Sequence, residues 1–109
     1  MCLFCRIVNK EQQADVVYED EKAVVFKDIN PKAPVHLLVV PRKHIETINH
    51  LEDQDKELIA HVIFLARDMA KKYEIAETGY QLKFNVGRGG GQIVDHLHLH
   101  LTSGKKYGE

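Results

Sequence analysis

The alternation of histidine and leucine over residues 96–101 constrains the fold more than any other feature of this chain. Histidines occupy positions 96, 98 and 100, and leucines occupy positions 97, 99 and 101. Successive side chains of a β-strand point to opposite faces, so the alternation predicts a strand from Ile93 to Leu101. Its leucines would face the core, and three imidazoles would share the other face at intervals of ~6.6 Å.

Three aligned imidazoles are compatible with two kinds of chemistry. One ring can act as a nucleophile or base while its neighbour donates hydrogen bonds to an anion. Alternatively, two or three rings can hold a divalent metal that keeps an open coordination position. A merely solvated polar face is a third interpretation, but such faces ordinarily carry Thr, Lys or Glu.

The glycine-rich segment 87–91 directly precedes these histidines. Glycines permit positive φ angles and close approach of a ligand to the main chain. Successive N–H groups in such a turn form a concavity that suits phosphate. A glycine run alone is more typical of a plain hairpin loop, but beside three histidines this flexible turn favours phosphate binding.

The rest of the chain predicts one small α+β domain. A length of 109 residues leaves room for a single compact unit. Apolar residues at helical spacing predict a short helix over 3–9 and an amphipathic helix from Asp53 to about Tyr73. Runs at 16–18, 23–26 and 35–40 and the alternation over 80–86 predict four further strands. Their order indicates a mainly antiparallel sheet with the helices on one face.

The charge balance and hydropathy exclude several classes of partner. Fifteen Lys plus Arg and sixteen Asp plus Glu give a net charge of −1, which predicts no attraction to nucleic acid. No apolar run approaches the roughly 20 residues of a membrane span, and residues 1–6 do not resemble a signal peptide. We therefore expect a cytoplasmic protein without nucleic-acid or membrane partners.

The segment 91–100, Gly-Gln-Ile-Val-Asp-His-Leu-His-Leu-His, resembles the histidine triad (HIT) signature, in which three histidines alternate with apolar residues. The resemblance to the nucleotide-binding-protein branch of that superfamily covers nearly the whole chain. Segments 3–7, 18–21, 26–36, 39–45 and 85–92 are similar to the corresponding parts of that branch. The resemblance implies a single HIT domain over residues 1–109, with a five-stranded, mainly antiparallel sheet, one long helix and one short helix.

The resemblance implies hydrolysis or transfer at the α-phosphorus of purine nucleoside 5′-monophosphate derivatives, as in a purine nucleoside phosphoramidase. His98 matches the nucleophile, which would form a covalent nucleotidyl-histidine that water then cleaves. The carbonyl of His96 or a nearby group would fix the tautomer of His98. His100 would donate to a phosphate oxygen or to the leaving group, and His36 matches a further histidine near the leaving group.

The same resemblance assigns the substrate-binding residues. Asp28 matches a carboxylate that accepts both ribose hydroxyls. Asn85, beside the loop that ends at Gly91, and the main-chain N–H groups of Gln92 and Ile93 would stabilise the phosphoryl oxygens. The walls of the base slot would be Leu3, Phe4, Ile7, Phe26 and Ile29, and we expect these apolar residues to belong to the core as well as to the pocket.

Ile93 departs from the branch, which usually has a serine there. Its hydroxyl is one neutral donor to phosphate, worth about 0.5–1.5 kcal/mol. We therefore expect a weaker enzyme of the same kind.

A second group of residues has the composition of a zinc site. Cys2 and Cys5 form a C-x-x-C pair, and with His44 and His96 they match the ligands of a closed tetrahedral site. Two packed cysteines are the alternative, whereas a thioredoxin-like redox pair is disfavoured because no βαβ pattern surrounds it. Bacterial proteins that this chain resembles carry zinc at the matching positions, so we expect structural Zn²⁺ and no organic cofactor.

Two other functions remain open at the level of sequence. One is a zinc hydrolase whose metal is held by the three triad histidines. The other is a nucleotide-binding or interaction module with incidental activity. The resemblance also implies a homodimer that pairs through the long helix and the strand at 80–86.

Overall fold

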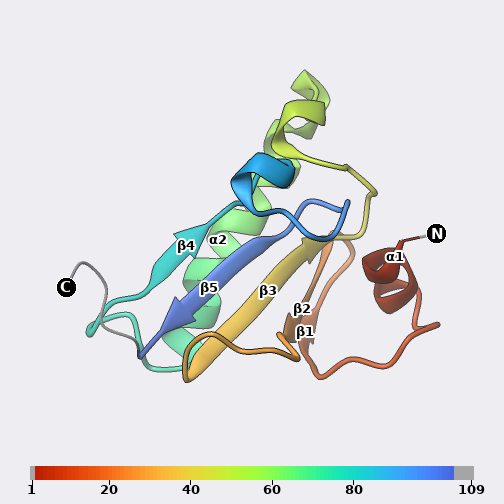
Figure 1. Cartoon of the computed structure of the whole chain (residues 1–109). Coiled ribbons are helices and arrows are strands. Elements are labelled where there is room, and N and C mark those ends of the chain that lie inside the picture. Colours follow the sequence, from red (N-terminus) through yellow and green to blue (C-terminus); the bar gives the residue numbers. More distant parts are fainter. Residues whose placement is uncertain (1, 105–109) are drawn as a thin grey trace.

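The computed structural model describes residues 2–104, which form a five-stranded sheet with one long and one short helix (Figure 1). The strand order is β1-β2-β3-β5-β4, and every neighbouring pair is antiparallel. This architecture confirms the predicted fold class. The strands are β1 (Val16–Glu19), β2 (Ala23–Lys27), β3 (Val35–Pro41), β4 (Gln81–Lys83) and β5 (Leu99–Ser103).

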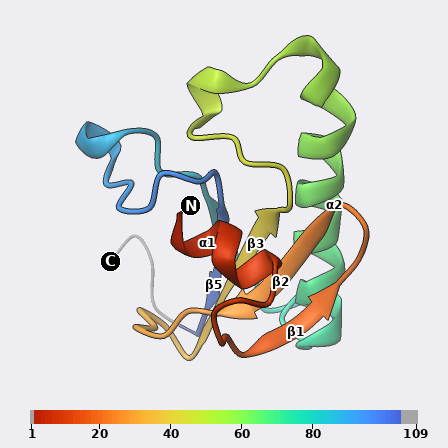
Figure 2. The same cartoon turned by 90° about the vertical axis from the view of Figure 1, so that its right-hand side faces the viewer.

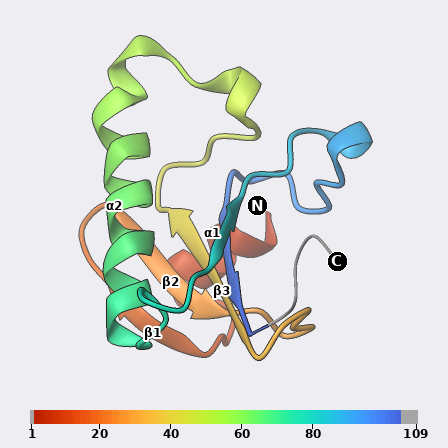
Figure 3. The same cartoon turned by 90° about the vertical axis from the view of Figure 1, so that its left-hand side faces the viewer.

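The two helices cover opposite faces of the sheet, so the expectation of helices on one face is wrong (Figures 2 and 3). The long helix α2 (Lys56–Lys72) packs on the side chains of Val25, Val39 and Leu101. The short helix α1 (Leu3–Val8) packs on the opposite face, against Phe26 and Leu38. Apolar residues fill β2 from Ala23 to Phe26 and β3 from Leu37 to Pro41 without alternation, which is typical of strands buried on both faces.

Strand β5 begins at Leu99, six residues later than predicted. Continuing the register of β3 with β5 would pair Pro41 with Leu97, but proline has no N–H to donate. The Pro41 carbonyl instead lies 2.8 Å from Nε2 of His96, and the chain bends over residues 94–96. His96 and His98 therefore precede the strand. All three triad histidines lie on the side of the sheet that carries α1, where His96 contacts the two cysteines and His98 packs beside His100.

The other boundaries differ from prediction for local reasons. Strand β4 ends at Lys83, which pairs with His100, because Leu99 is the only residue of β5 beyond that pair. Residues 53–55 form a separate 3₁₀ turn before α2. The glycine segment contains another 3₁₀ turn over Arg88–Gly90, bounded by Gly87 and Gly91 with φ of 67° and 85°. Both of these angles lie in the region that favours glycine.

No helix within residues 2–104 is long and apolar enough to cross a membrane.

Candidate active site and metal centre

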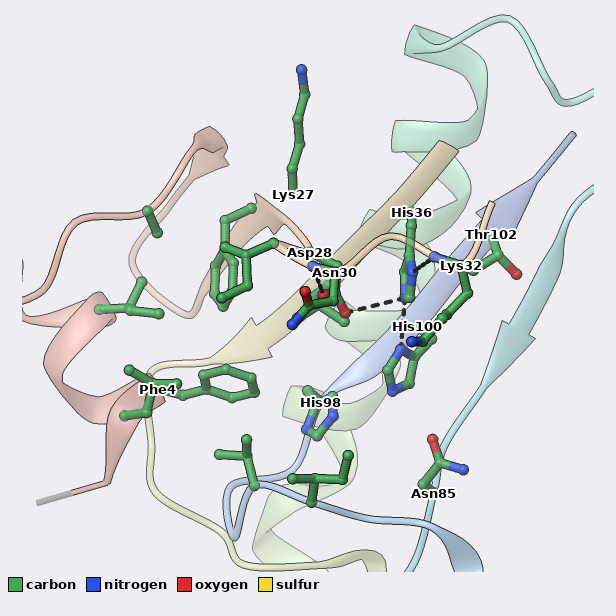
Figure 4. Close-up of a pocket in the computed structure, with 18 of the residues that line it drawn as sticks. Phe4, Lys27, Asp28, Asn30, Lys32, His36, Asn85, His98, His100 and Thr102 are labelled. Carbon is green, nitrogen blue, oxygen red and sulfur yellow. Dashed lines mark hydrogen bonds and ion pairs between the residues drawn. The ribbon is translucent and has the colours of Figure 1, made fainter. Parts of the chain in front are cut away.

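A cavity of about 580 Å³ opens on the face of the sheet that carries α1 (Figure 4). Helix α1, the ends of β2 and β3, the glycine loop and strands β4 and β5 all contribute to its wall. The cavity brings together most of the residues that the sequence predicted. These are Leu3, Phe4, Ile7, Phe26, Asp28, Ile29, His36, Asn85, Gly91, Ile93, His98 and His100.

His98 is buried in the wall of this cavity, with one ring nitrogen fixed by the main chain. Its Nδ1 donates to the carbonyl of His96 at 2.8 Å, one of the contacts expected from the sequence. Because a carbonyl only accepts, this contact leaves Nε2 with a lone pair. Burial lowers the pKa of His98 below its ordinary value, which keeps that lone pair free. The edge of the Phe4 ring packs against the imidazole at 5.0 Å.

His36 and His100 form a hydrogen-bonded pair beside His98. Nε2 of His36 lies 2.9 Å from Nδ1 of His100, and the main-chain N–H of Lys32 donates to Nδ1 of His36 at 3.0 Å. Burial lowers the pKa of both rings, that of His100 to about 4, with neighbouring positive charge from Lys83 as a smaller cause. Both rings are therefore neutral near pH 7.

Asp28 lies at the end of β2, where its carboxylate faces the cavity. Its Oδ1 accepts the main-chain N–H of Asn30 at 2.8 Å, and its Oδ2 lies 3.5 Å from Nε2 of His36. Each oxygen of an ionised carboxylate can accept more than one hydrogen bond, so Asp28 retains acceptor capacity.

The glycine loop is fastened to the rest of the site by two amide side chains. Asn85 donates from Nδ2 to the Gly90 carbonyl at 2.7 Å. The side chain of Gln92 is buried, donates to the carbonyls of Glu46 and Val94, and accepts the Gly87 N–H. The main-chain N–H of Gln92 donates to the Gly87 carbonyl at 2.9 Å. This hydrogen bond occupies the group that the sequence assigned to phosphate, so that role of Gln92 does not fit the structure.

Ile93 differs from Gln92, because its main-chain N–H donates no hydrogen bond within residues 2–104. Its side chain is 85% exposed at the rim of the cavity, and Ile29 is 84% exposed there. Both isoleucines therefore lie at the entrance rather than in the core.

The end of the cavity next to α1 is lined mainly by apolar side chains. The rings of Phe4 and Phe26 meet edge to face at 5.4 Å, and Leu38 packs with them. Sequence reasoning missed Leu38, and it missed the polar residues Lys32, Gln81, Lys83 and Thr102, which also line the cavity. The alternation over 80–86 could have predicted Gln81 and Lys83. Both share one face of that segment with Asn85, which was predicted to be in the site.

The second predicted group also assembles. Cys2 Sγ and Cys5 Sγ lie 3.2–3.5 Å from Nδ1 of His44 and of His96, and the two Nδ1 atoms lie 3.3 Å apart. These four residues come from α1 and its N-cap, the segment after β3 and the bend before β5.

The donor set fits zinc. Zinc bonds of about 2.3 Å to sulfur and 2.0–2.1 Å to nitrogen give a tetrahedron with S–N edges of roughly 3.5 Å and N–N edges of roughly 3.3 Å. His96 presents Nδ1 to this group because its Nε2 donates to the Pro41 carbonyl, the kind of outer contact that orients metal-binding histidines. Since His96 belongs to this group and lines no part of the cavity, a metal held by all three triad histidines does not fit the structure.

Comparison with known proteins identifies the class. The family described as "Scavenger mRNA decapping enzyme C-term binding" matches residues 1–109. A HIT family hydrolase from Legionella pneumophila has 49% identical residues and a TM-score of 0.95, over 97% of this chain and 95% of that one. A histidine triad protein from Clostridium difficile has 39% identity and a TM-score of 0.94, over 99% and 94%.

Curated relatives agree with these structures. The purine nucleoside phosphoramidase of Escherichia coli K12 is 38% identical over 97% of this chain and 89% of its own length. Protein HitA of Neisseria gonorrhoeae is 41% identical over 92% of each chain. The chain belongs to the histidine triad superfamily, and the relatives it matches include HIT family hydrolases.

Proposed function

We propose that this protein hydrolyses nucleoside 5′-phosphoramidates, with a preference for purine nucleosides. The observation that carries the proposal is His98, whose Nδ1 is held by the His96 carbonyl while Nε2 keeps its lone pair in the cavity wall. A nucleophile with a fixed tautomer and a lowered pKa is suited to attack at phosphorus near neutral pH. The identity to the E. coli phosphoramidase supports the same reaction.

The site divides the substrate into three parts. The base would lie between the apolar walls formed by Leu3, Phe4, Ile7, Phe26 and Ile29, and the ribose hydroxyls would donate to Asp28. The phosphoryl oxygens would accept from Asn85, from the Ile93 N–H beside Gly91 and from His100. Gln92 would act indirectly, because its side chain holds the glycine loop.

The reaction would proceed in two displacements. Nε2 of His98 forms a bond to the α-phosphorus while the phosphorus–nitrogen bond to the leaving group breaks. The leaving amine takes a proton that water supplies. A second water molecule then attacks the same phosphorus and gives a proton to the hydroxide ion left by the first, the bond to His98 breaks, and the products are the nucleoside monophosphate and neutral His98.

The direct test is AMP release from adenosine 5′-phosphoramidate. We expect wild-type protein to release AMP and His98→Ala to lose at least a thousandfold in kcat while it still binds AMP. His50→Ala is the matched control, because His50 is exposed and lies outside the cavity. Turnover by His98→Ala within tenfold of wild type would remove His98 as the nucleophile. Tight AMP binding by a wild-type protein without turnover would instead favour a nucleotide-binding module.

We also propose that Cys2, Cys5, His44 and His96 hold one structural Zn²⁺ per chain. The edges of the donor tetrahedron and the outer hydrogen bond of His96 support this proposal. Two thiolates and two imidazoles complete four-coordination, so the ion would have no open position for a water nucleophile. Its role would be to join α1 to the bend that presents His98.

The remaining proposals concern assembly and location. Ile63 and Phe64 of α2 and Leu82 of β4 are exposed apolar side chains, as a homodimer through this helix and strand would require. Light scattering on wild type and on Phe64→Glu tests this, with a dimer expected only for wild type; a monomeric wild type would contradict it. A cytoplasmic location stays a prediction.

A further inference from the structure

The cavity has two chemically different ends, because it crosses the sheet from β2 to β4. At the β2 end, α1 and the first strands supply mainly apolar walls around Phe4 and Phe26, and the polar residues of this part of the lining are Gln12, Gln13 and Lys27. His98 and His100 lie in the middle. At the far end, Lys83 and Gln81 of β4 pair in register with His100 and Thr102 of β5, and all four residues line the cavity.

Two lysines give this far end a positive charge. Lys83 is the cross-strand neighbour of His100, and Lys32 lies beside His36, to which its main chain is hydrogen bonded (Figure 4). Within residues 2–104 neither ammonium group forms a salt bridge. The third lysine of the cavity, Lys27, differs from them because it lies 3.7 Å from Asp15.

The ionisation of the histidines supports the same placement of charge. Lys83 contributes to lowering the pKa of both His36 and His100, and Lys32 contributes to lowering that of His36. The charge of Lys83 therefore acts at both rings next to the nucleophile, and that of Lys32 acts at His36. The negative charge of Asp28 raises the pKa of both histidines and so opposes the lysines. Its carboxylate lies on the side of His36 that faces the proposed ribose site.

We propose that the β4 end of the cavity, formed by Lys32, Lys83, Gln81 and Thr102, is a subsite for a leaving group that carries a carboxylate or a phosphate. The inference rests on the proposed function and specifies its substrate class. The base occupies the apolar end, so the group that departs from phosphorus must lie toward β4 or in solvent. Two ammonium groups that form no salt bridge within residues 2–104 and two neutral side chains at that end are suited to an anion.

The favoured substrates are accordingly nucleoside phosphoramidates whose amine bears an acidic group. His98 bonds to phosphorus, the phosphorus–nitrogen bond breaks, and the amine leaves with a proton from water. The acidic group stays ionised throughout and takes no part in bond breaking. The lysines act by binding this group, so they are specificity-determining residues.

Three adenosine phosphoramidates test the subsite: the conjugates of glycine and of glycinamide, which are nearly equal in size, and the larger conjugate of 2-aminoethyl phosphate. We expect wild-type kcat/KM to be at least fivefold higher for the glycine conjugate than for the glycinamide conjugate at low salt. The difference should shrink as the ionic strength rises, because the charges are exposed. Comparing the 2-aminoethyl phosphate conjugate with the glycine conjugate shows whether the subsite prefers a phosphate or a carboxylate.

Variants at both lysines complete the test. Lys32→Met and Lys83→Met should each reduce the glycine-to-glycinamide ratio, and the double variant should bring it close to one. Lys83→Glu should favour the glycinamide conjugate. Lys71→Met is the control for net charge, since Lys71 is exposed on α2 outside the cavity, and its ratio should equal that of wild type.

The outcomes separate this inference from the proposed function. Turnover of all three conjugates with a ratio near one, or with a ratio that both lysine variants leave unchanged, overturns the subsite alone. No turnover of any conjugate, although AMP binds, overturns the proposed function and the subsite with it.

Discussion

Nε2 of His36 lies 2.9 Å from Nδ1 of His100, and this contact determines which nitrogen of His100 carries the proton. The Lys32 N–H donates to Nδ1 of His36, so the proton of neutral His36 is on Nε2. That proton is donated to Nδ1 of His100, which leaves the proton of neutral His100 on Nε2. A main-chain amide of the β2–β3 loop thus makes His100 a hydrogen-bond donor toward the cavity.

The first prediction concerns this chain of hydrogen bonds. His36→Phe removes the donor to His100 while keeping a ring of similar size, so the tautomer of His100 is no longer fixed. We expect kcat for adenosine 5′-phosphoramidate to fall by about a hundredfold, with a much smaller change in KM. His36→Gln can still donate to His100 and should recover part of the loss. A kcat for His36→Phe within threefold of wild type would contradict this role.

The second prediction concerns recognition of ribose by Asp28. Charge-assisted hydrogen bonds contribute about 1.5–3 kcal/mol each. We therefore expect Asp28→Asn to weaken AMP binding by about tenfold to a hundredfold, measured by calorimetry. In wild type, 2′,3′-dideoxy-AMP should bind more weakly than AMP, and the two should bind alike in the variant. Equal affinities in wild type would show that Asp28 does not bind the hydroxyls.

Much of this site was predictable from the sequence, because its signals are local. The alternation of His98, Leu99 and His100 reflects the period of a strand, and one of these histidines lies on β5 itself. The C-x-x-C pair is also a local signal, because its two cysteines are three positions apart at the N-terminus of α1. The resemblance to the triad signature supplied the residues distant in sequence, such as Asp28 and His36, which periodicity alone could not connect.

What the sequence did not predict depends on tertiary register. Pro41 lies beyond the last β3 residue that pairs with β5, and its carbonyl binds the ring of His96, so the strand predicted from Ile93 begins only at Leu99. Lys83 became part of the cavity only once β4 was paired with β5 at His100. Strand β2 is buried on both faces because α1 packs on one of them, and no local sequence pattern predicts where α1 packs.

The third prediction concerns the exposed side chain of Ile93. The related branch usually has a serine here, whose hydroxyl can donate to a phosphoryl oxygen. Because Ile93 is 85% exposed, replacing it should disturb no packing. We expect Ile93→Ser to raise kcat/KM by about two- to tenfold, the effect of one neutral hydrogen bond. Ile93→Ala controls for loss of bulk, and an equal gain in both variants would exclude the hydroxyl as the cause.

The fourth prediction concerns acid stability. An unperturbed histidine binds a proton as the pH falls through about 6.5, whereas folded His100 remains neutral until about pH 4. Between these values the unfolded chain binds more protons, so the free energy of unfolding falls as the pH falls.

His100→Gln should therefore reduce the slope of melting temperature against pH between 6.5 and 4, measured by calorimetry beside wild type in the same buffers. Both proteins retain the cysteine–histidine group, so any loss of metal on acidification is common to them. Identical slopes would mean that His100 ionises alike in the folded and unfolded chains.

The last prediction concerns zinc removal. A ligand present at a hundredfold above its Kd stabilises the folded state by about 2.7 kcal/mol, which corresponds to a shift of roughly 10–20 °C in a domain of about 100 residues. We expect about one zinc per chain by elemental analysis and a fall of this size in the melting temperature when a chelator is added.

Cys5→Ser should lose zinc, melt at the lower temperature and no longer respond to the chelator. His50→Ala should behave as wild type, because His50 lies outside this group. Residual activity of the chelated protein below its melting temperature distinguishes a structural ion from a catalytic one, since four protein ligands leave no position for an activated water. A wild-type protein without zinc, with a melting temperature that the chelator leaves unchanged, would mean that Cys2 and Cys5 are packed thiols.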